Sequence, residues 1–167
     1  MRYMATGGGT GGHVYPALAA LEALVARADD GARPDELCWV GSSAGVERGI
    51  LGRTAYRYEA VATGPLRGAN PLQALRSVAL ILRGTGQALR LIKGWRPAAV
   101  LATGGFVSVP LALAAWLRRV PVLLYLPDME PGLAIKLLAR IAARVAVSFA
   151  PTAAYFGAKA VITGYPV

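Results

Sequence analysis

Glycine residues near the amino terminus form the part of the sequence best suited to chemistry. Residues 7–12 read Gly-Gly-Gly-Thr-Gly-Gly and are followed by His13, the only histidine, and by Pro16. Glycine has no Cβ and adopts positive φ, so backbone N–H groups can approach a ligand closely. Pro16 is typical of the first turn of a helix, whose positive end attracts anions. The run therefore predicts an anion-binding site formed by Gly9, Thr10, Gly11 and Gly12. A tight turn that binds no ligand is the alternative.

Histidine is the side-chain type that titrates near neutral pH, which makes His13 the candidate catalytic residue. A positive helix end disfavours imidazolium, and this favours a neutral base that removes a proton from a substrate. A bound diphosphate would favour the charged form instead, with His13 as a phosphate ligand. A histidine that only hydrogen-bonds the loop is the third alternative.

Two common nucleotide-binding motifs fit the glycine run poorly. Gly7, Gly9 and Gly12 match G-x-G-x-x-G, but a dinucleotide site also needs an acidic residue after the second strand, and residues 41–43 read Gly-Ser-Ser. A P-loop needs Lys after the last glycine, where this sequence has His13. A nicotinamide-dependent oxidoreductase is therefore the disfavoured alternative.

A second glycine turn follows a later strand candidate, and an acidic loop containing Asp128 and Glu130 follows the next one. The carboxyl ends of parallel strands meet at one edge of a sheet, so these loops should converge with the glycine run. Ser108 is also expected to cap the helix that follows the second turn. The alternative to a substrate role for Asp128 and Glu130 is that they only stabilise the N-terminus of the next helix. A bulky residue at Gly11 or Gly105 should abolish binding of the anionic ligand while leaving the fold largely intact. The predicted contacts are Gly104, Gly105, Phe106, Ser108 and Asp128.

Strand-like and helix-like segments alternate along the chain. Apolar strands separated by helices predict an α/β fold with a doubly wound, Rossmann-like parallel sheet. The chain is expected to be one domain, residues 1–167. The expected strands are Arg2–Thr6, Leu37–Val40, Tyr56–Val61, Ala98–Ala102, Pro121–Leu126, Val145–Ser148 and Ala160–Ile162. The expected helices are Tyr15–Ala28, Val46–Leu51, Pro71–Lys93 (one helix, or two interrupted near Gly84), Ser108–Arg118 and Gly132–Ala143.

The segment 71–93 has an unusual distribution of side chains. One face is expected in the core, and it contains Ala74, Val78, Ile81, Leu82, Leu89 and Ile92. The opposite face carries arginines flanked by leucines, which is typical of a helix that binds a membrane surface or a partner. An ordinary solvated arginine face is the alternative. The predicted membrane patch consists of Leu72, Leu75, Arg76, Leu80, Arg83, Trp116, Lys136 and Arg140.

Composition narrows the class of partner. The net charge of +9 and the pI of about 10.3 favour anionic partners. The basic residues form no dense run, and this disfavours nucleic acid. We expect neither a signal peptide nor a spanning segment, and the single Cys38 fits a reducing compartment as a small core residue.

Several motifs together resemble the N-terminal domain of the MurG-type family of bacterial glycosyltransferases, family 28, which form lipid II. The glycine run through Ala19 is similar to that family's first glycine loop, and residues 104–110 are similar to its second. Residues 113–116, 131–133 and 163–167 match in order and spacing. The family usually has His-Glu-Gln-Asn before its Pro-Gly-Leu turn, whereas this chain has Tyr125-Leu126-Pro127-Asp128.

The resemblance implies the N-terminal half of a GT-B enzyme, peripheral on the cytoplasmic face of the bacterial membrane. It implies an inverting transfer of GlcNAc from UDP-GlcNAc to lipid I, with no cofactor on this domain, the donor mainly on a C-terminal domain and the acceptor diphosphate at the glycine loops. A fragment without that second domain is expected to be inactive. The alternatives are a membrane-anchoring subunit of a split glycosyltransferase and a related enzyme with another lipid-linked acceptor.

Overall fold

The computed structural model of the chain describes residues 1–27, 33, 36–64 and 70–166. These residues form one sheet of seven strands in the order β3-β2-β1-β4-β5-β6-β7, and every pairing is parallel. The expected doubly wound α/β fold is confirmed. The strands are β1 (Tyr3–Thr6), β2 (Leu37–Gly41), β3 (Arg57–Ala60), β4 (Ala99–Ala102), β5 (Val122–Leu126), β6 (Arg144–Val147) and β7 (Ala160–Ile162).

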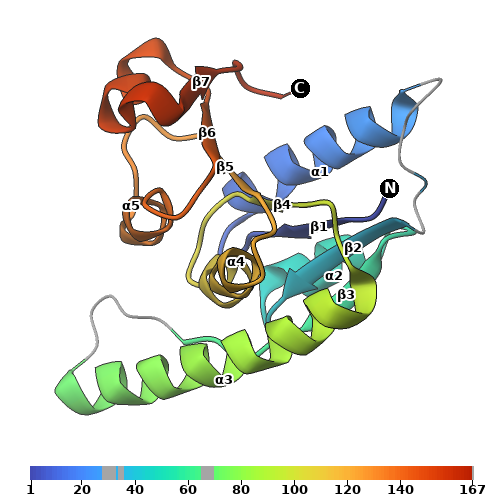
Figure 1. Ribbon diagram of the computed structural model, residues 1–167, viewed down its shortest axis with the longest axis vertical. Coiled ribbons are helices and arrows are strands. Elements are labelled where there is room, and N and C mark those ends of the chain that lie inside the picture. Colours follow the sequence, from blue (N-terminus) through green and yellow to red (C-terminus); the bar gives the residue numbers. More distant parts are fainter. Residues whose placement is uncertain (28–32, 34–35, 65–69, 167) are drawn as a thin grey trace.

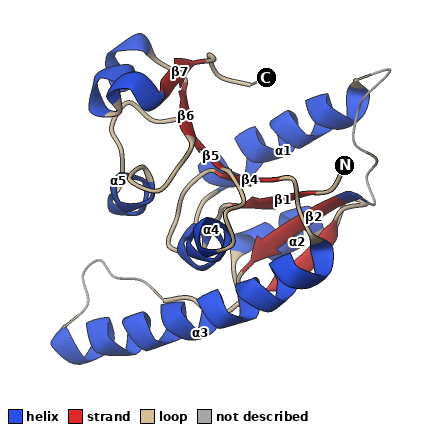
Figure 2. Cartoon of the chain, viewed as in Figure 1, coloured by secondary structure: helices blue, strands red, loops and turns tan. Residues whose placement is uncertain are grey.

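Helices cover both faces of the sheet (Figures 1 and 2). Successive side chains of β2 point to opposite faces of the sheet. Leu37 and Trp39 belong to one apolar core, and Cys38 and Val40 belong to the other. The first core includes residues of α1 and α2, and the second includes residues of α3, α4 and α5. Two 3-10 segments, Ala150–Tyr155 and Gly157–Lys159, precede β7. The helices are α1 (Gly11–Ala26), α2 (Val46–Leu51), α3 (Pro71–Trp95), α4 (Ser108–Leu117) and α5 (Leu133–Leu138).

Helix α1 begins at Gly11, four positions before the expected Tyr15. Thr10 is extended (φ −146°, ψ 157°) and is the N-cap residue. The last two glycines of the run and His13 therefore lie in the first helical turn, not in the preceding loop. The expected end at Ala28 lies outside the described residues.

Helix α3 is one continuous helix of 25 residues, which excludes the alternative of two helices. A capping box between Asn70 and Gln73 begins it. Gly84 does not interrupt the helix. A Cβ at this position would collide with the carbonyl oxygen of Ala62, so glycine here allows α3 to approach the backbone of Ala62 closely. The buried face accordingly carries small residues together with Ile81 and Ile92. The expectation that Val78 and Leu82 belong to the core is wrong, since they are 44% and 67% exposed.

Candidate functional site

The two glycine loops lie side by side because β1 and β4 are neighbours in the sheet. The backbone N–H of Thr103 donates to the carbonyl of Thr6 (3.0 Å), and its Oγ1 donates to the carbonyl of His13 (2.6 Å). A Cβ on Gly105 would collide with the carbonyl oxygen of Gly8. The carboxyl ends of the two central strands therefore form one interlocked structure, where the sheet order reverses direction.

Most of these glycines are required for packing. A Cβ on Gly8 would lie 2.6 Å from Oε2 of Glu47, and one on Gly104 would lie 3.1 Å from the His13 ring. Gly104 and Gly105 also have positive φ, 119° and 76°, which side chains disfavour. The lack of a side chain at these positions therefore permits the close packing of the loops.

Gly9 and Gly12 differ, because space in front of them is open. Gly9 has φ 86° and no heavy atom within 4 Å of its Cβ position, and for Gly12 the nearest is Thr10 Oγ1 at 3.6 Å. The Thr10 side chain makes no capping hydrogen bond, and the first turn of α1 contains no acidic residue. The N-terminus of α1 thus leaves backbone N–H groups for an external acceptor.

A cavity of about 500 Å³, the histidine cavity, adjoins the first turn of α1, the second glycine loop and the β5–α5 loop. The His13 ring borders it, and Nδ1 is buried without a hydrogen-bond partner. Thr152 holds the acidic loop by donating to the carbonyl of Met129 (3.0 Å). The cavity brings together His13, Gly105, Phe106, Leu126, Asp128, Met129, Glu130, Gly132, Leu133, Ala134 and Ile135.

A second cavity of about 550 Å³, the serine cavity, lies on the other side of Phe106, which borders both. It opens at the carboxyl ends of β1, β2 and β3 and reaches Leu80 on α3. Its lining consists of Gly8, Gly9, Ser42, Ser43, Ala44, Gly45, Glu47, Val61, Ala62, Thr63, Gly64, Leu80, Phe106 and Val107.

Glu47 in the wall of the serine cavity is a candidate that the sequence reasoning missed. Its side chain is 1% exposed, and Oε1 accepts hydrogen bonds from the backbone N–H (2.9 Å) and Oγ (2.8 Å) of Ser42. Oε2 is buried and has no partner. The signal was present, because Glu47 follows a Gly-Ser-Ser-Ala-Gly turn placed after β2 as the other glycine turns follow their strands.

Tyr58 fixes the same turn from below. Its hydroxyl donates to the carbonyl of Ser42 (2.6 Å). Burial, and secondarily the negative charge of Glu47, raise the pKa of Tyr58 to about 12. The phenol is therefore protonated and able to donate at every physiological pH.

Ser108 is placed differently from the expectation. It is buried and is the first residue of α4, and its Oγ donates to the carbonyl of Gly104 (2.5 Å). The N-cap residue is Val107, so the predicted cap at Ser108 is wrong. Ser108 supports the second loop from inside the core and is unable to contact a ligand.

The predicted membrane patch separates into parts. The α3 stripe, defined as Leu72, Leu75, Val78 and Leu82, is exposed beside Arg76 and Arg83, with Leu72 76% exposed. Trp116, at the end of α4, is also exposed. Leu80 does not belong with them, because it is half-buried and borders the serine cavity.

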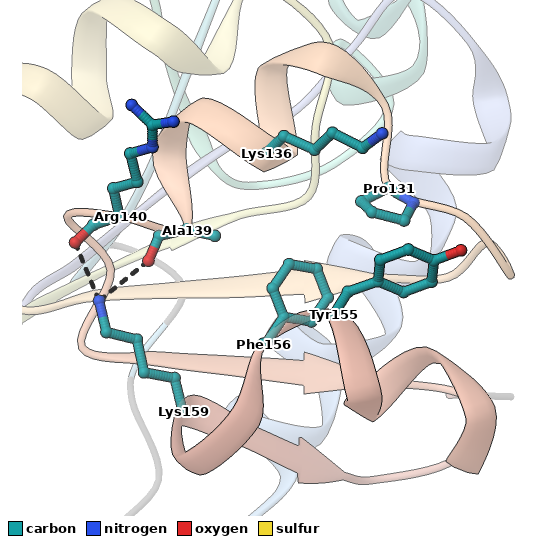
Figure 3. A pocket seen from close by; sticks show the side chains of 7 residues that line it. All are labelled: Pro131, Lys136, Ala139, Arg140, Tyr155, Phe156 and Lys159. Atoms are coloured by element: carbon teal, nitrogen blue, oxygen red, sulfur yellow. Dashed lines mark hydrogen bonds between the residues drawn. The ribbon is translucent and has the colours of Figure 1, made fainter.

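Lys136 and Arg140 border a separate hollow beside the C-terminal 3-10 segments (Figure 3). Their side chains point toward opposite ends of it, so they do not converge on one group. Lys159 donates to the carbonyls of Ala139 (3.0 Å) and Arg140 (2.9 Å), just beyond the end of α5. Helix α5 accordingly ends at Leu138 rather than at the expected Ala143.

The segment that departs from the resembled family is partly buried. The hydroxyl of Tyr125 is 2.6 Å from Oγ of Ser148, and burial raises its pKa. Asp128 is exposed and borders the histidine cavity. Among the described residues, no three His, Cys, Asp or Glu side chains come together as metal ligands, and no helix is long and apolar enough to cross a membrane.

Comparisons with known proteins show the family of the chain. Residues 3–147 match the model of the glycosyltransferase family 28 N-terminal domain. The chain is 42% identical to the UDP-N-acetylglucosamine–N-acetylmuramyl-(pentapeptide) pyrophosphoryl-undecaprenol N-acetylglucosamine transferases of Roseiflexus sp. (strain RS-1) and Desulforudis audaxviator (strain MP104C). Both alignments cover 100% of this chain and 46% and 44% of the relatives. The chain thus spans about half the length of these relatives.

Solved structures show the same fold. MurG from Acinetobacter baumannii superposes with a TM-score of 0.78 at 28% identity, over 99% of this chain and 45% of that one. A UDP-GlcNAc 2-epimerase from Neisseria meningitidis, solved with UDP-GlcNAc, gives a TM-score of 0.70 at 12% identity, over 99% and 46% of the two chains. The second likeness shows the shared fold alone.

Proposed function

The chain belongs to the glycosyltransferase family 28 N-terminal domain family, and from this premise we propose that it is the acceptor-binding half of a GlcNAc transferase. The acceptor is N-acetylmuramyl-(pentapeptide) pyrophosphoryl-undecaprenol, as in the names of its relatives. The donor is UDP-GlcNAc, bound mainly by a second domain that faces the carboxyl edge of the sheet.

The uncapped N-terminus of α1 is the observation that supports this proposal best. Gly9 turns the chain with positive φ, Gly12 leaves space, and Thr10 makes no competing cap. Backbone N–H groups and the helix dipole at such an end stabilise a diphosphate without a metal. We assign the acceptor diphosphate to this end of α1.

His13 is the proposed base. It lies in the first turn of α1, so a diphosphate bound there brings the acceptor sugar close to the histidine cavity. In the reaction a sugar hydroxyl attacks the anomeric carbon of GlcNAc, the bond to UDP breaks, and the hydroxyl proton passes to the imidazole.

The α3 stripe supports docking on an anionic membrane at its cytoplasmic face. Leucines beside arginines bury apolar surface among lipid chains while the guanidinium groups meet anionic head groups. Trp116 adds an amphipathic ring of the kind found at membrane interfaces. Such a surface would hold the chain where a lipid-linked acceptor is available.

Calorimetric titration of the chain tests the proposal. We expect a soluble acceptor analogue with a short prenyl chain, and inorganic pyrophosphate more weakly, to bind. We expect UDP-GlcNAc to bind much more weakly than the acceptor analogue. Binding of UDP-GlcNAc with no binding of the acceptor analogue would overturn the assignment of this half to the acceptor.

A further inference from the structure

Two of the three hydroxyl side chains that line the serine cavity, Ser42 and Thr63, have already donated their protons inside the protein. Ser42 Oγ donates to Glu47 Oε1 (2.8 Å), and Thr63 Oγ1 donates to the carbonyl of Phe106 (3.0 Å). A hydroxyl has one proton and two lone pairs, so both oxygens can now only accept. These two side chains therefore present acceptors, not donors, to a ligand.

The Glu47 carboxylate adds a stronger acceptor in the same wall. Oε2 has no partner, and it lies in the space that Gly8 and Gly45 leave, because a Cβ on either glycine would collide with it. Gly8, Gly45 and Glu47 all line the cavity, so the carboxylate belongs to its wall. A buried carboxylate oxygen without a partner is costly, and an N–H donor from a ligand would remove that cost.

The rest of the lining is unsuited to phosphate. Val61, Leu80 and Val107 give the cavity an apolar side. The neighbouring cation, Arg48, donates to the carbonyl of Ser43 (3.1 Å) on the backbone of the turn. A phosphate here would meet acceptors and a carboxylate, whereas the N-terminus of α1 offers donors.

We propose that the serine cavity binds the peptide of the acceptor through its N–H groups, with Glu47 as the residue that attracts them. This inference rests on the proposed function. Gly9 borders the cavity and also precedes the α1 end assigned to the diphosphate. The acceptor thus lies across Gly9, with its diphosphate on one side and its peptide on the other.

Two soluble acceptor analogues test this inference by calorimetry: a short-prenyl muramyl-pentapeptide diphosphate and the same compound without the peptide. Glu47→Gln keeps the volume of the side chain and an oxygen for Ser42 but removes the charge. We expect it to weaken the pentapeptide analogue about tenfold and to leave the peptide-free analogue unchanged. Glu59→Gln, at an exposed ion pair with Arg57 on β3 (2.6 Å), is the matched control and should change neither.

Thr63→Val is a second test variant if Glu47→Gln fails to fold, since it removes one hydrogen-bond acceptor while keeping the shape of the side chain. We expect about a threefold loss for the pentapeptide analogue alone. Equal losses for both analogues would overturn the inference and leave Glu47 as a support of the glycine loop, with the proposed function intact. No change for either analogue would overturn it too. Failure of the wild-type chain to bind either analogue would overturn the proposed function as well.

Discussion

In the proposed function the interlocked glycine loops face the acceptor diphosphate and the α3 stripe faces an anionic membrane, but the two regions are built in opposite ways. In the loops several positions are fixed by a close contact, such as Gly105 against the carbonyl of Gly8. In the stripe, Leu75 and Leu82 are each 67% exposed and pack against little. A substitution in the loops changes backbone geometry, whereas a substitution in the stripe changes only the apolar area and the charge of the surface.

This difference predicts how each region tolerates change. Loop function should depend on single atoms and be lost in one step. Stripe function should depend on summed apolar area and charge and be lost gradually.

Gly105→Val should have the largest effect. A side chain at φ 76° is strained, and its Cβ collides with the backbone of Gly8. We expect a loss of about 2–4 kcal/mol in the free energy of unfolding and loss of acceptor binding. The collision makes us expect a larger loss of stability than the sequence alone predicted for a bulky residue here. Urea unfolding measures it, with Gly12→Ala, in open space, as the control that should change stability by less than about 1 kcal/mol.

His13→Ala comes next. In the full-length enzyme we expect kcat to fall about 10²–10⁴-fold if the imidazole is the base. Steady-state kinetics measures this, and a phosphate ligand would instead show mainly weakened acceptor binding. Unchanged kcat and KM would remove His13 from the site.

Leu75→Asp should have a smaller effect, because other residues of the stripe remain. We expect binding to anionic vesicles to weaken about tenfold or more, and wild-type binding to decrease with salt. Cosedimentation with vesicles measures both. Val161→Asp, an exposed apolar position on β7, is the control. Equal wild-type binding to neutral and anionic vesicles at every salt concentration would contradict docking through charge.

The smallest effect concerns Tyr58 beneath the loops. Its folded pKa of about 12 lies above the ordinary value of 10, so its contribution to stability is complete below pH 10 and is lost as pH rises toward 12. Partial exposure reduces the effect to about 1 kcal/mol. Urea unfolding at pH 9 and pH 11 should show a larger loss for the wild type than for Tyr58→Phe, and equal losses would contradict the buried hydrogen bond to Ser42.

The sequence predicted the sheet and the meeting of the two glycine turns, because apolar strands and strand-to-helix turns are local patterns with few topological solutions. It could not assign roles to individual glycines. Gly8 and Gly104 are glycines because Glu47 and His13 occupy the space beside them. That packing joins residues distant in the chain.

The errors on α3 have the same origin. Periodicity indicates an apolar face, but α3 buries small residues where Gly84 approaches Ala62 and leaves Leu82 exposed. Tertiary contact, not hydrophobicity, decided the orientation of this helix. Ser108 was misplaced for a similar reason, since its hydroxyl satisfies the carbonyl of Gly104 in the core.

Thr10 offers the most direct test of the central claim, that the uncapped end of α1 binds the acceptor diphosphate. Thr10→Asp puts a charged cap at this end, which stabilises the helix while repelling an anion, and Thr10→Asn supplies a neutral cap of the same shape. In calorimetric titrations with the peptide-free diphosphate analogue, we expect Thr10→Asp to bind at least about tenfold more weakly than Thr10→Asn, with unfolding free energies equal or higher for Asp. Equal affinities of the two variants would contradict the account.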